Sequence, residues 1–527
     1  MGEQLLRIAA AAITSVLFCL STLQCVGAMQ QSGYKNGKFL RWIKRKDNLY
    51  FNRLSVQALC LLLACTVVSL CFSFLGVKGA LLVSAAPCFI LQLLFFYSDR
   101  KYALKVRYTP TNRFCRLFAV YILFVVCFEY FLIALLTFLA AWNGSVTYGL
   151  IAYAPFAIMP ILLPALLVCA NAVCSVFENA HNKKFVKRAG QVLDETKIIR
   201  VGIVGSYGKT SVKNILNVLL SEKYATVATP ESFNTPMGIA KTVYSSAFEN
   251  KQVLIAEMGA RKAGDIEALC GLVKPDYAIF TGVCLQHAET FGSIENVLKE
   301  KSAILRYGVK KAVCGAELKG QIPEENVLFA EIPTAVEFDA TETRFTLKVG
   351  GAEIPVKTKL LGRAGVENIA LAATLAYEMG LTVEELARAI EKITPVPHRL
   401  QLLESGGAYV LDDGYNANVR GAEEALAALC RFHGEKCVVT PGIVECGILE
   451  ESINGELGEK IAKANLDKVI LVGDTLVGAV KKGYEKVGGN AEKLTVVPTL
   501  EKAQELLAEW VKTGSAVLFL NDLPDVY

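Results

Sequence analysis

Long apolar runs dominate the first 180 residues of the chain. A helix of about 20 apolar residues is long enough to cross the roughly 30 Å hydrocarbon layer of a bilayer. Five runs reach this length and predict five transmembrane helices, at residues 5–28, 54–77, 79–97, 117–141 and 148–176. The fifth run contains Pro155, Pro160 and Pro164, so a kinked or broken helix is expected there.

Basic residues in the connecting segments predict how these helices are oriented. The 29–53 and 98–116 segments are rich in Lys and Arg, whereas 142–147 carries no charge and 76–79 carries only Lys78. Because positively charged loops stay on the cytoplasmic side, we expect the N-terminus outside and everything after about residue 180 in the cytoplasm. The predicted location is the cell membrane, with several spans in the lipid bilayer.

Two features of the apolar region leave alternatives open. The first run ends in Val26-Gly27-Ala28, which resembles a signal-peptide cleavage site. Cleavage would leave the basic 29–53 segment outside, so a retained helix is favoured. Glu129 lies within the fourth run, where an acid is costly and often functional. Between these, the role we favour for Glu129 is that of a neutral carboxylic acid hydrogen-bonded inside the helix bundle.

After about residue 196 the pattern changes to short apolar strands that alternate with helices. Strands are predicted at 197–204, 277–281, 436–440 and 468–472, and helices at about 212–220, 420–431, 451–464, 475–487 and 500–512. This alternation predicts doubly wound parallel sheets. The predicted fold is therefore an α-helical membrane domain, residues 1–182, followed by two α/β domains, residues 196–395 and 396–527.

Charge divides the chain in the same way. Residues 1–190 hold 19 Lys and Arg against 5 Asp and Glu, a net of +14, and the remainder holds 36 against 45, a net of −9, which together give the +5 of the whole chain. The basic residues lie between apolar runs, so nothing favours binding to nucleic acid. The 16 cysteines form no CxxC pair after residue 180, which argues against zinc and for a reducing compartment.

A glycine-rich loop joins the first predicted strand of the α/β region to a helix. Strand, glycine turn and helix N-terminus together direct backbone N–H groups at phosphate. Lys209 would reach the β- and γ-phosphates of ATP, and the Thr210 hydroxyl would ligate Mg²⁺. The predicted nucleotide ligands are Gly205, Ser206, Gly208, Lys209, Thr210 and Ser211.

The glycine spacing of this loop is unusual. Position 203 is Ile, so the strict GxxxxGK[ST] pattern is not met and the spacing is instead GxxGxxGKTS. A chance glycine turn before a helix is the alternative. Two later segments accompany the loop: Ser232-Phe233-Asn234-Thr235-Pro236-Met237-Gly238 and Asp412-Asp413-Gly414-Tyr415-Asn416-Ala417-Asn418.

With these segments, residues 196–527 resemble the Mur ligase family, the ADP-forming amide ligases that build the peptidoglycan stem peptide. The likeness is greatest to the branch that adds D-alanyl-D-alanine. The resemblance implies a P-loop ATPase central domain and a Rossmann-like C-terminal domain. Soluble family members carry a UDP-sugar-binding domain before the phosphate loop, where this chain carries the predicted spans.

The resemblance also implies how metal is held. Thr210, Glu257 and His287 would bind Mg²⁺, with two metal sites in all. Lys301 would be carbamylated, which converts a cation into an anion able to hold a metal. Lys299 and an ordinary solvated helix are the alternatives to Lys301. Catalytic roles are assigned on this basis to Lys209, His287 and Lys301.

Nucleotide and substrate contacts follow from the same resemblance. Further ATP contacts are implied for Asn368, Arg399 and Asp413. The implied substrate contacts are Asn234, Thr235, Tyr415, Asn416 and Asn418. Family members usually write His-Asn where this chain has Ala364-Gly365, so the base contact is altered and the preference for ATP over GTP stays open.

The predicted function is that of an ADP-forming acid–amino-acid ligase in peptidoglycan precursor synthesis. It would activate a carboxylate as an acyl phosphate and join it to an amino acid or dipeptide. The carboxylate would belong to a peptidoglycan precursor or another membrane-borne molecule, and UDP-linked and lipid-linked forms both remain open. The alternatives are a membrane-associated polyglutamate-type ligase, a transport ATPase and a nucleotide-binding scaffold without turnover.

Overall fold

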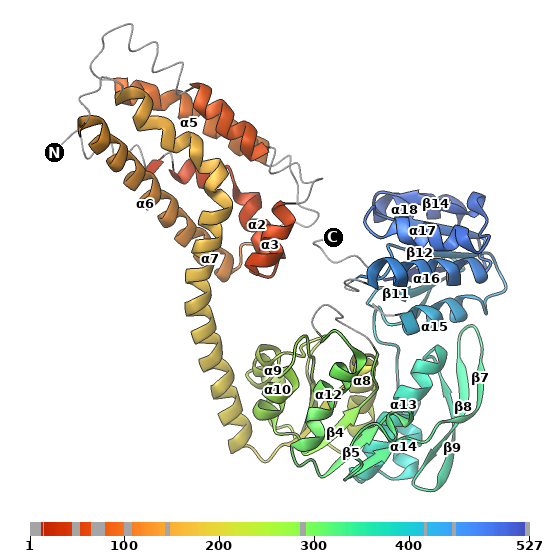
Figure 1. Cartoon of the computed structure of the whole chain (residues 1–527). Helices are drawn as coiled ribbons and strands as arrows, with labels where there is room; N and C mark the ends of the chain where they lie inside the picture. The colour runs from red at the N-terminus through yellow and green to blue at the C-terminus, as the bar shows by residue number, and fades with distance from the viewer. Residues whose placement is uncertain are drawn as a thin grey trace. The chain divides into compact units, whose positions relative to one another are not determined.

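The computed structural model describes residues 12–13, 15–44, 53–64, 80–99, 108–142, 148–284, 291–415, 419–444 and 449–521. It divides the chain into two compact units (Figure 1). We call Met1–His181 the helical unit and Asn182–Leu523 the α/β unit. The boundary between them falls within helix α7 (Tyr148–Glu195).

Helices make up most of the described part of the helical unit. They are residues 15–20, α2 (Leu23–Gln31), α3 (Asn36–Ile43), Arg53–Ala64, α5 (Ala80–Asp99), α6 (Asn112–Trp142) and the first part of α7. By length and composition, Asn112–Leu132 and Ile158–Glu195 could each cross a membrane. These stretches overlap the fourth and fifth predicted spans. Parts of the other three lie outside the described residues, so a total of five spans stays a prediction.

Two helices differ from the sequence prediction. The first apolar run is not one helix, because a turn at residues 21–22 separates residues 15–20 from α2. A kink or a break was expected at the prolines of the fifth run. The break does not occur, since α7 is continuous through all three prolines, and the kink stays a prediction. α7 also extends beyond residue 176, because Ala189 and Leu193 are buried within the α/β unit.

The helical unit buries many polar side chains and exposes many apolar ones. Buried polar residues include Gln57, Gln92, Glu129 and Asn171. Large apolar side chains that are more than half exposed include Leu63, Leu94, Leu123, Phe131 and Phe138. A protein surrounded by water has few such exposed patches and rarely buries charge.

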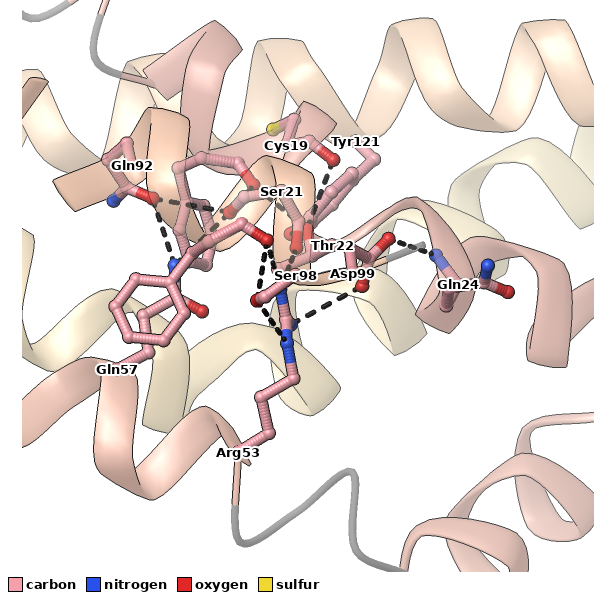
Figure 2. Close-up of polar contacts among 12 residues, drawn as sticks. Cys19, Ser21, Thr22, Gln24, Arg53, Gln57, Gln92, Ser98, Asp99 and Tyr121 are labelled. Carbon is pink, nitrogen blue, oxygen red and sulfur yellow. Dashed lines mark hydrogen bonds and ion pairs between the residues drawn. The ribbon is translucent and has the colours of Figure 1, made fainter. Parts of the chain in front are cut away.

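A buried ion pair lies at the break in the first helix (Figure 2). Arg53 Nη1 is 3.3 Å from Asp99 Oδ1, and the two side chains are 2% and 5% exposed. Arg53 Nη2 donates to the carbonyl oxygens of Ser21 at 3.0 Å and Phe95 at 2.6 Å, while Asp99 accepts from the N–H of Gln24 at 3.2 Å. The pair therefore adds hydrogen bonds to backbone groups at the turn and near the end of α5.

Further polar contacts extend this cluster (Figure 2). Gln57 Nε2 donates to Ser21 Oγ at 3.1 Å and to Gln92 Oε1 at 2.9 Å. Separately, the buried Glu129 carboxyl accepts a hydrogen bond from the Ser15 hydroxyl. This contact is the one expected if Glu129 is held within the bundle.

The first part of the α/β unit is a six-stranded parallel sheet in the order β2-β3-β1-β4-β5-β6. Its strands are β1 (Ile199–Val204), β2 (Thr226–Ala228), β3 (Val253–Glu257), β4 (Tyr277–Phe280), β5 (Lys311–Cys314) and β6 (Val327–Phe329). The helices with it are α8 (Lys209–Leu220), α9 (Pro236–Val243), α10 (Asp265–Val273), α12 (Ile294–Lys301), α13 (Gly362–Glu378) and α14 (Val383–Ile390). Apolar residues of β1, β3, α8 and α13 form one core.

A small antiparallel sheet follows β6, with the order β7-β8-β9. Its strands are β7 (Thr334–Phe338), β8 (Thr343–Val349) and β9 (Ala352–Thr358). Phe345, Leu347 and Val349 of β8 are buried in the core of the central sheet, while alternate residues face away from it. The sequence analysis did not predict this sheet.

The second sheet has the order β10-β11-β15-β12-β13-β14. It comprises β10 (Gln401–Ser405), β11 (Ala408–Asp413), β12 (Lys436–Thr440), β13 (Lys468–Val472), β14 (Leu494–Val497) and β15 (Ala516–Leu520). Its helices are α15 (Val419–Leu429), α16 (Glu450–Lys463), α17 (Val477–Lys486) and α18 (Leu500–Trp510). Only the edge strand β10 is antiparallel to its neighbour among the described strands of this sheet. The predicted α/β fold with parallel sheets is confirmed.

Replacing Arg53 by alanine should strongly destabilise the helical unit. The substitution removes the positive charge that pairs with the buried Asp99 carboxylate, and removing one member of a buried ion pair costs about 3–5 kcal/mol. We expect a clear fall in the thermal unfolding midpoint of R53A purified in detergent. The Arg116–Glu178 pair, whose arginine is 58% exposed, provides the control. R116A should cost less than about 1 kcal/mol, and an equal loss in both variants would contradict the role of Arg53.

Candidate active site

The phosphate loop connects β1 to α8 at the carboxyl edge of the central sheet. Gly208 precedes α8 with a φ of 72°, a left-handed conformation that glycine adopts without strain. A Cβ at this position would lie 2.6 Å from Asn368 Oδ1 on α13. The loop is thus packed against α13 as well as against β1. This explains how Asn368, predicted as a nucleotide contact, comes to lie beside it.

Two lysines donate hydrogen bonds to the same carbonyl oxygen of the phosphate loop. Lys209 Nζ donates to the Gly205 oxygen at 2.8 Å, and Lys301 Nζ donates to the same oxygen at 2.6 Å. Lys301 is 3% exposed, whereas Lys299 is exposed. Burial, and then the charge of Lys209, hold the pKa of Lys301 well below its usual range. Of the two lysines considered from the sequence, Lys301 is the one at the site.

Glu257, at the end of β3, is the centre of a polar cluster in front of the loop. Its carboxylate accepts hydrogen bonds from Thr210 Oγ1 at 3.0 Å, from Lys213 Nζ at 3.2 Å and from Asn234 Nδ2 at 3.2 Å. Its backbone N–H donates to Thr229 Oγ1 at 3.1 Å. Glu257 is only 2% exposed, so these contacts fix the direction of the carboxylate.

The cluster has the donor atoms that magnesium requires. Mg²⁺ prefers oxygen ligands, and the Glu257 carboxylate and the Thr210 hydroxyl lie side by side at the phosphate loop. Within the described residues, no three or more His, Cys, Asp or Glu side chains gather in a metal-binding group. His287, the predicted ligand of a second metal, lies outside the described residues.

Lys213 was missed by the sequence analysis. Its side chain is 1% exposed and pairs with Glu257. Burial lowers the pKa of Lys213, against the opposing effect of Glu257. A signal was available, because Lys213 stands three residues before Leu216 and seven before Leu220, both of them buried on α8. A lysine within an apolar stripe, one turn after a phosphate-loop lysine, indicates a buried charge with a partner.

Residues of the C-terminal domain, 396–527, complete the site. Asp413, at the end of β11, is buried and accepts a hydrogen bond from the Leu400 N–H at 2.9 Å. The charge of Arg399 contributes to lowering the pKa of Lys209, after burial and against the effect of Glu257. Arg399 therefore lies within electrostatic range of the phosphate loop.

A cleft of about 270 Å³ brings most of the predicted residues together. Its lining includes Ser206, Gly208, Lys209, Thr210, Ser211, Asn234, Glu257, Asn368, Arg399, Asp413 and Tyr415. Gly205 of the loop and Lys301 are not among the described lining residues, and they are joined by the hydrogen bond described above. Thr235 caps α9 by accepting from the Gly238 N–H at 3.2 Å. Asn416 and Asn418 lie outside the described residues.

Ala364 and Gly365 also line the cleft, together with Leu360, Leu361 and Leu400. A Cβ on Gly365 would lie 2.9 Å from the Leu360 Cβ, so close packing explains the glycine without any nucleotide. This side of the cleft is apolar, in contrast to the side formed by the phosphate loop. It can accept the flat face of a base, while base selectivity stays open.

Comparison with known proteins identifies the family. Residues 203–376 match the Mur ligase middle domain, and residues 398–521 match the Mur ligase, glutamate ligase domain. The UDP-N-acetylmuramoyl-tripeptide–D-alanyl-D-alanine ligase of Escherichia coli K12 is 29% identical over 293 residues, which cover 52% of this chain and 64% of that enzyme. The chain thus spans just under two thirds of that relative. The ligase of the same name from Mycobacterium bovis is 33% identical over 356 residues, covering 60% and 69%.

A solved structure agrees with these matches. The MurF ligase of Thermotoga maritima, in complex with ADP, superposes with a TM-score of 0.59 at 26% sequence identity. The alignment covers 66% of this chain and 81% of that one. Both family domains are matched, in order, and together they cover more than half of the chain. The mycobacterial relative is 33% identical and is covered to 69% of its length. The chain therefore belongs to the Mur ligase family.

Proposed function

We propose that the chain is an ADP-forming acid–amino-acid ligase that uses ATP and Mg²⁺ in peptidoglycan precursor synthesis. The observation that carries the proposal is the meeting of Lys209, Thr210 and Glu257 at a phosphate loop whose cleft also contains Arg399 and Asp413. Phosphoryl transfer requires mainly positioning and neutralisation of charge. An amine, a hydroxyl and a carboxylate on a rigid loop and strand supply both.

The reaction would proceed in two steps. A substrate carboxylate oxygen forms a bond to the γ-phosphorus of ATP, the bond to the β–γ bridging oxygen breaks, and ADP leaves. The amine nitrogen then attacks the acyl carbon, phosphate leaves with the bonding pair, and the nitrogen loses its proton to give the amide. Lys209 would neutralise phosphate charge during the first step. Mg²⁺ at Thr210 and Glu257 would supply further neutralisation, and Lys213 would keep Glu257 in its orientation.

Carbamylation of Lys301 is part of the proposal. Carbon dioxide reacts with a neutral amine, forming an N–C bond with loss of a proton. Burial and the Lys209 charge lower the pKa of Lys301, which increases the neutral fraction at physiological pH. The resulting anion would also reduce the electrostatic repulsion between Lys301 and Lys209 at the loop. With His287 it would hold a second Mg²⁺.

The substrates follow from the names of the relatives. Those enzymes join D-alanyl-D-alanine to a UDP-N-acetylmuramoyl-tripeptide, so we propose the dipeptide as the amine and a muramoyl-tripeptide as the carboxylate.

We also propose that the helical unit anchors the chain in the cell membrane by several spans, with the α/β unit in the cytoplasm and the N-terminus outside. Its exposed apolar and buried polar side chains support this location. A lipid-linked tripeptide is the alternative acceptor.

Purified protein should release ADP only when both a tripeptide acceptor and D-alanyl-D-alanine are present. We expect mass spectrometry to show an acceptor heavier by one dipeptide residue, with UDP-linked and lipid-linked tripeptides tested separately. K209A should lower kcat by about 10²–10³-fold, because it removes one group that stabilises the transferring phosphoryl. ADP release that needs neither acceptor nor amine would contradict ligation.

Incubation with ¹³C-labelled bicarbonate should give a carbamate signal in the ¹³C NMR spectrum. We expect the signal in the wild-type protein and in K299M, because Lys299 is exposed. K301M should lack it, since the buried amine is gone. A signal of equal size in K301M would show that Lys301 is not the carbamylated residue.

The full-length protein should remain in the membrane fraction after washing with alkaline carbonate, because its apolar helices would be embedded in lipid. In sealed spheroplasts, protease added outside should leave the α/β unit intact. Release by the wash would disprove anchoring by membrane spans. Digestion of the α/β unit in intact spheroplasts would disprove the proposed orientation.

A further inference from the structure

We propose that Arg420 is a positioning residue that couples the C-terminal domain to the phosphate loop through Tyr207. Arg420 stands at the start of α15, and its guanidinium lies 4.9 Å from the centroid of the Tyr207 ring. Its Nη1 also donates to the Tyr207 hydroxyl at 2.9 Å. Tyr207 lies within the phosphate loop, between Ser206 and Gly208, so the two domains meet at the loop itself.

Two carboxylates hold the guanidinium in this place. Arg420 Nη1 is 3.1 Å from Glu317 Oε2, and Nη2 is 2.8 Å from Glu367 Oε2. Glu317 follows β5, and Glu367 belongs to α13. The Tyr207 hydroxyl in turn donates to Glu317. Three segments that are distant in sequence thus converge on one side chain of the C-terminal domain. We call Tyr207, Glu317, Glu367 and Arg420 the arginine cluster.

The shape of arginine suits this arrangement better than that of lysine. A planar guanidinium can stack on an aromatic ring while its edge donates to two carboxylates and a hydroxyl. A lysine ammonium is a compact charge without such a plane. The cluster therefore requires an arginine for its geometry and not only for its charge.

The other side of Tyr207 is fixed to the central sheet. Thr281 Oγ1 donates to the Tyr207 carbonyl at 2.5 Å, and the neighbouring Ser206 N–H donates to the Gly282 carbonyl at 2.8 Å. A Cβ on Gly282 would overlap both the Tyr207 hydroxyl and the Glu317 carboxylate. Because there is so little free space, we expect a displacement of Arg420 to change the position of Tyr207 and of the loop backbone that carries it.

The expected effect is moderate, since the charged groups are partly exposed. The side chains of Arg420, Glu317 and Glu367 are 35%, 43% and 37% exposed, and exposed ion pairs are individually weak. A network of two ion pairs and a cation–π contact is stronger than a single ion pair. We expect R420A to weaken ADP binding about tenfold, which corresponds to about 1.4 kcal/mol.

Arg431 offers a matched control. Its guanidinium lies 4.5 Å from the ring of Phe338 on β7, so it also joins the C-terminal domain to the middle domain through an arginine and an aromatic ring. Among the described residues that line the cleft, neither Arg431 nor Phe338 is present. R431A therefore removes a domain contact of the same chemistry without touching the phosphate loop.

The test combines hydrogen–deuterium exchange with nucleotide titration on the full-length protein. In R420A we expect faster exchange of the amides of residues 205–211 without nucleotide, and an ADP dissociation constant raised about tenfold. R431A should leave both at wild-type values. R420K and E317Q should fall between wild type and R420A, and they provide the same readouts if R420A does not fold.

Unchanged exchange and unchanged ADP affinity in R420A would overturn the proposal. Equal changes in R420A and R431A would also overturn it, because general domain contact would then be the cause. The inference rests on the proposed function only in taking an adenine nucleotide as the ligand. A protein that binds ADP without ligating would fail the proposed function and leave this test intact, whereas a ligating protein indifferent to R420A would fail this inference alone.

Discussion

Crowding of positive charge at the phosphate loop is the constraint on which the α/β unit depends. Lys209 and Lys301 share the Gly205 carbonyl, and Lys213 pairs with Glu257 one turn further along α8. Burial lowers the pKa of all three lysines. Buried ammonium groups are unfavourable unless anions approach them, and the phosphates of a nucleotide are such anions. The phosphate loop, the end of β3 and the C-terminal domain together form the cleft in which those phosphates would bind.

Part of this arrangement could be predicted from the sequence because it is local. The glycine loop, the strand before it and the helix after it are contiguous, so Lys209 and Thr210 follow from the motif alone. Glu257 was implied by the resemblance to the Mur ligase family, and its place at the end of β3 brings it to the same edge of the sheet as the loop. The role of Arg420 could not be predicted, because its partners Glu317 and Glu367 lie 103 and 53 residues away from it, and no local pattern links them. Lys213 is intermediate, since its burial is visible only in the pattern of α8.

In the helical unit, too, some features could be predicted from the local sequence, and others depend on contacts with distant segments. Apolar runs predict helices, because their length and composition are read directly from the chain. The break near Ser21 depends on Arg53 and Asp99, which stabilise the freed backbone groups from segments far along the sequence. In α7 the prolines produce no break, although proline disfavours a continuous helix. Near Ser21, contacts from distant segments outweigh the local apolar pattern.

We propose one chemical account for the two units: an enzyme, anchored in the membrane by the helical unit, whose α/β unit transfers a phosphoryl group to a carboxylate. The most direct test uses a tripeptide acceptor whose carboxylate carries ¹⁸O, with ATP and D-alanyl-D-alanine. An acyl phosphate intermediate requires one ¹⁸O atom to appear in the inorganic phosphate released, and mass spectrometry would detect it. Phosphate free of label, with its oxygen derived from water, would contradict carboxylate activation and with it the central claim.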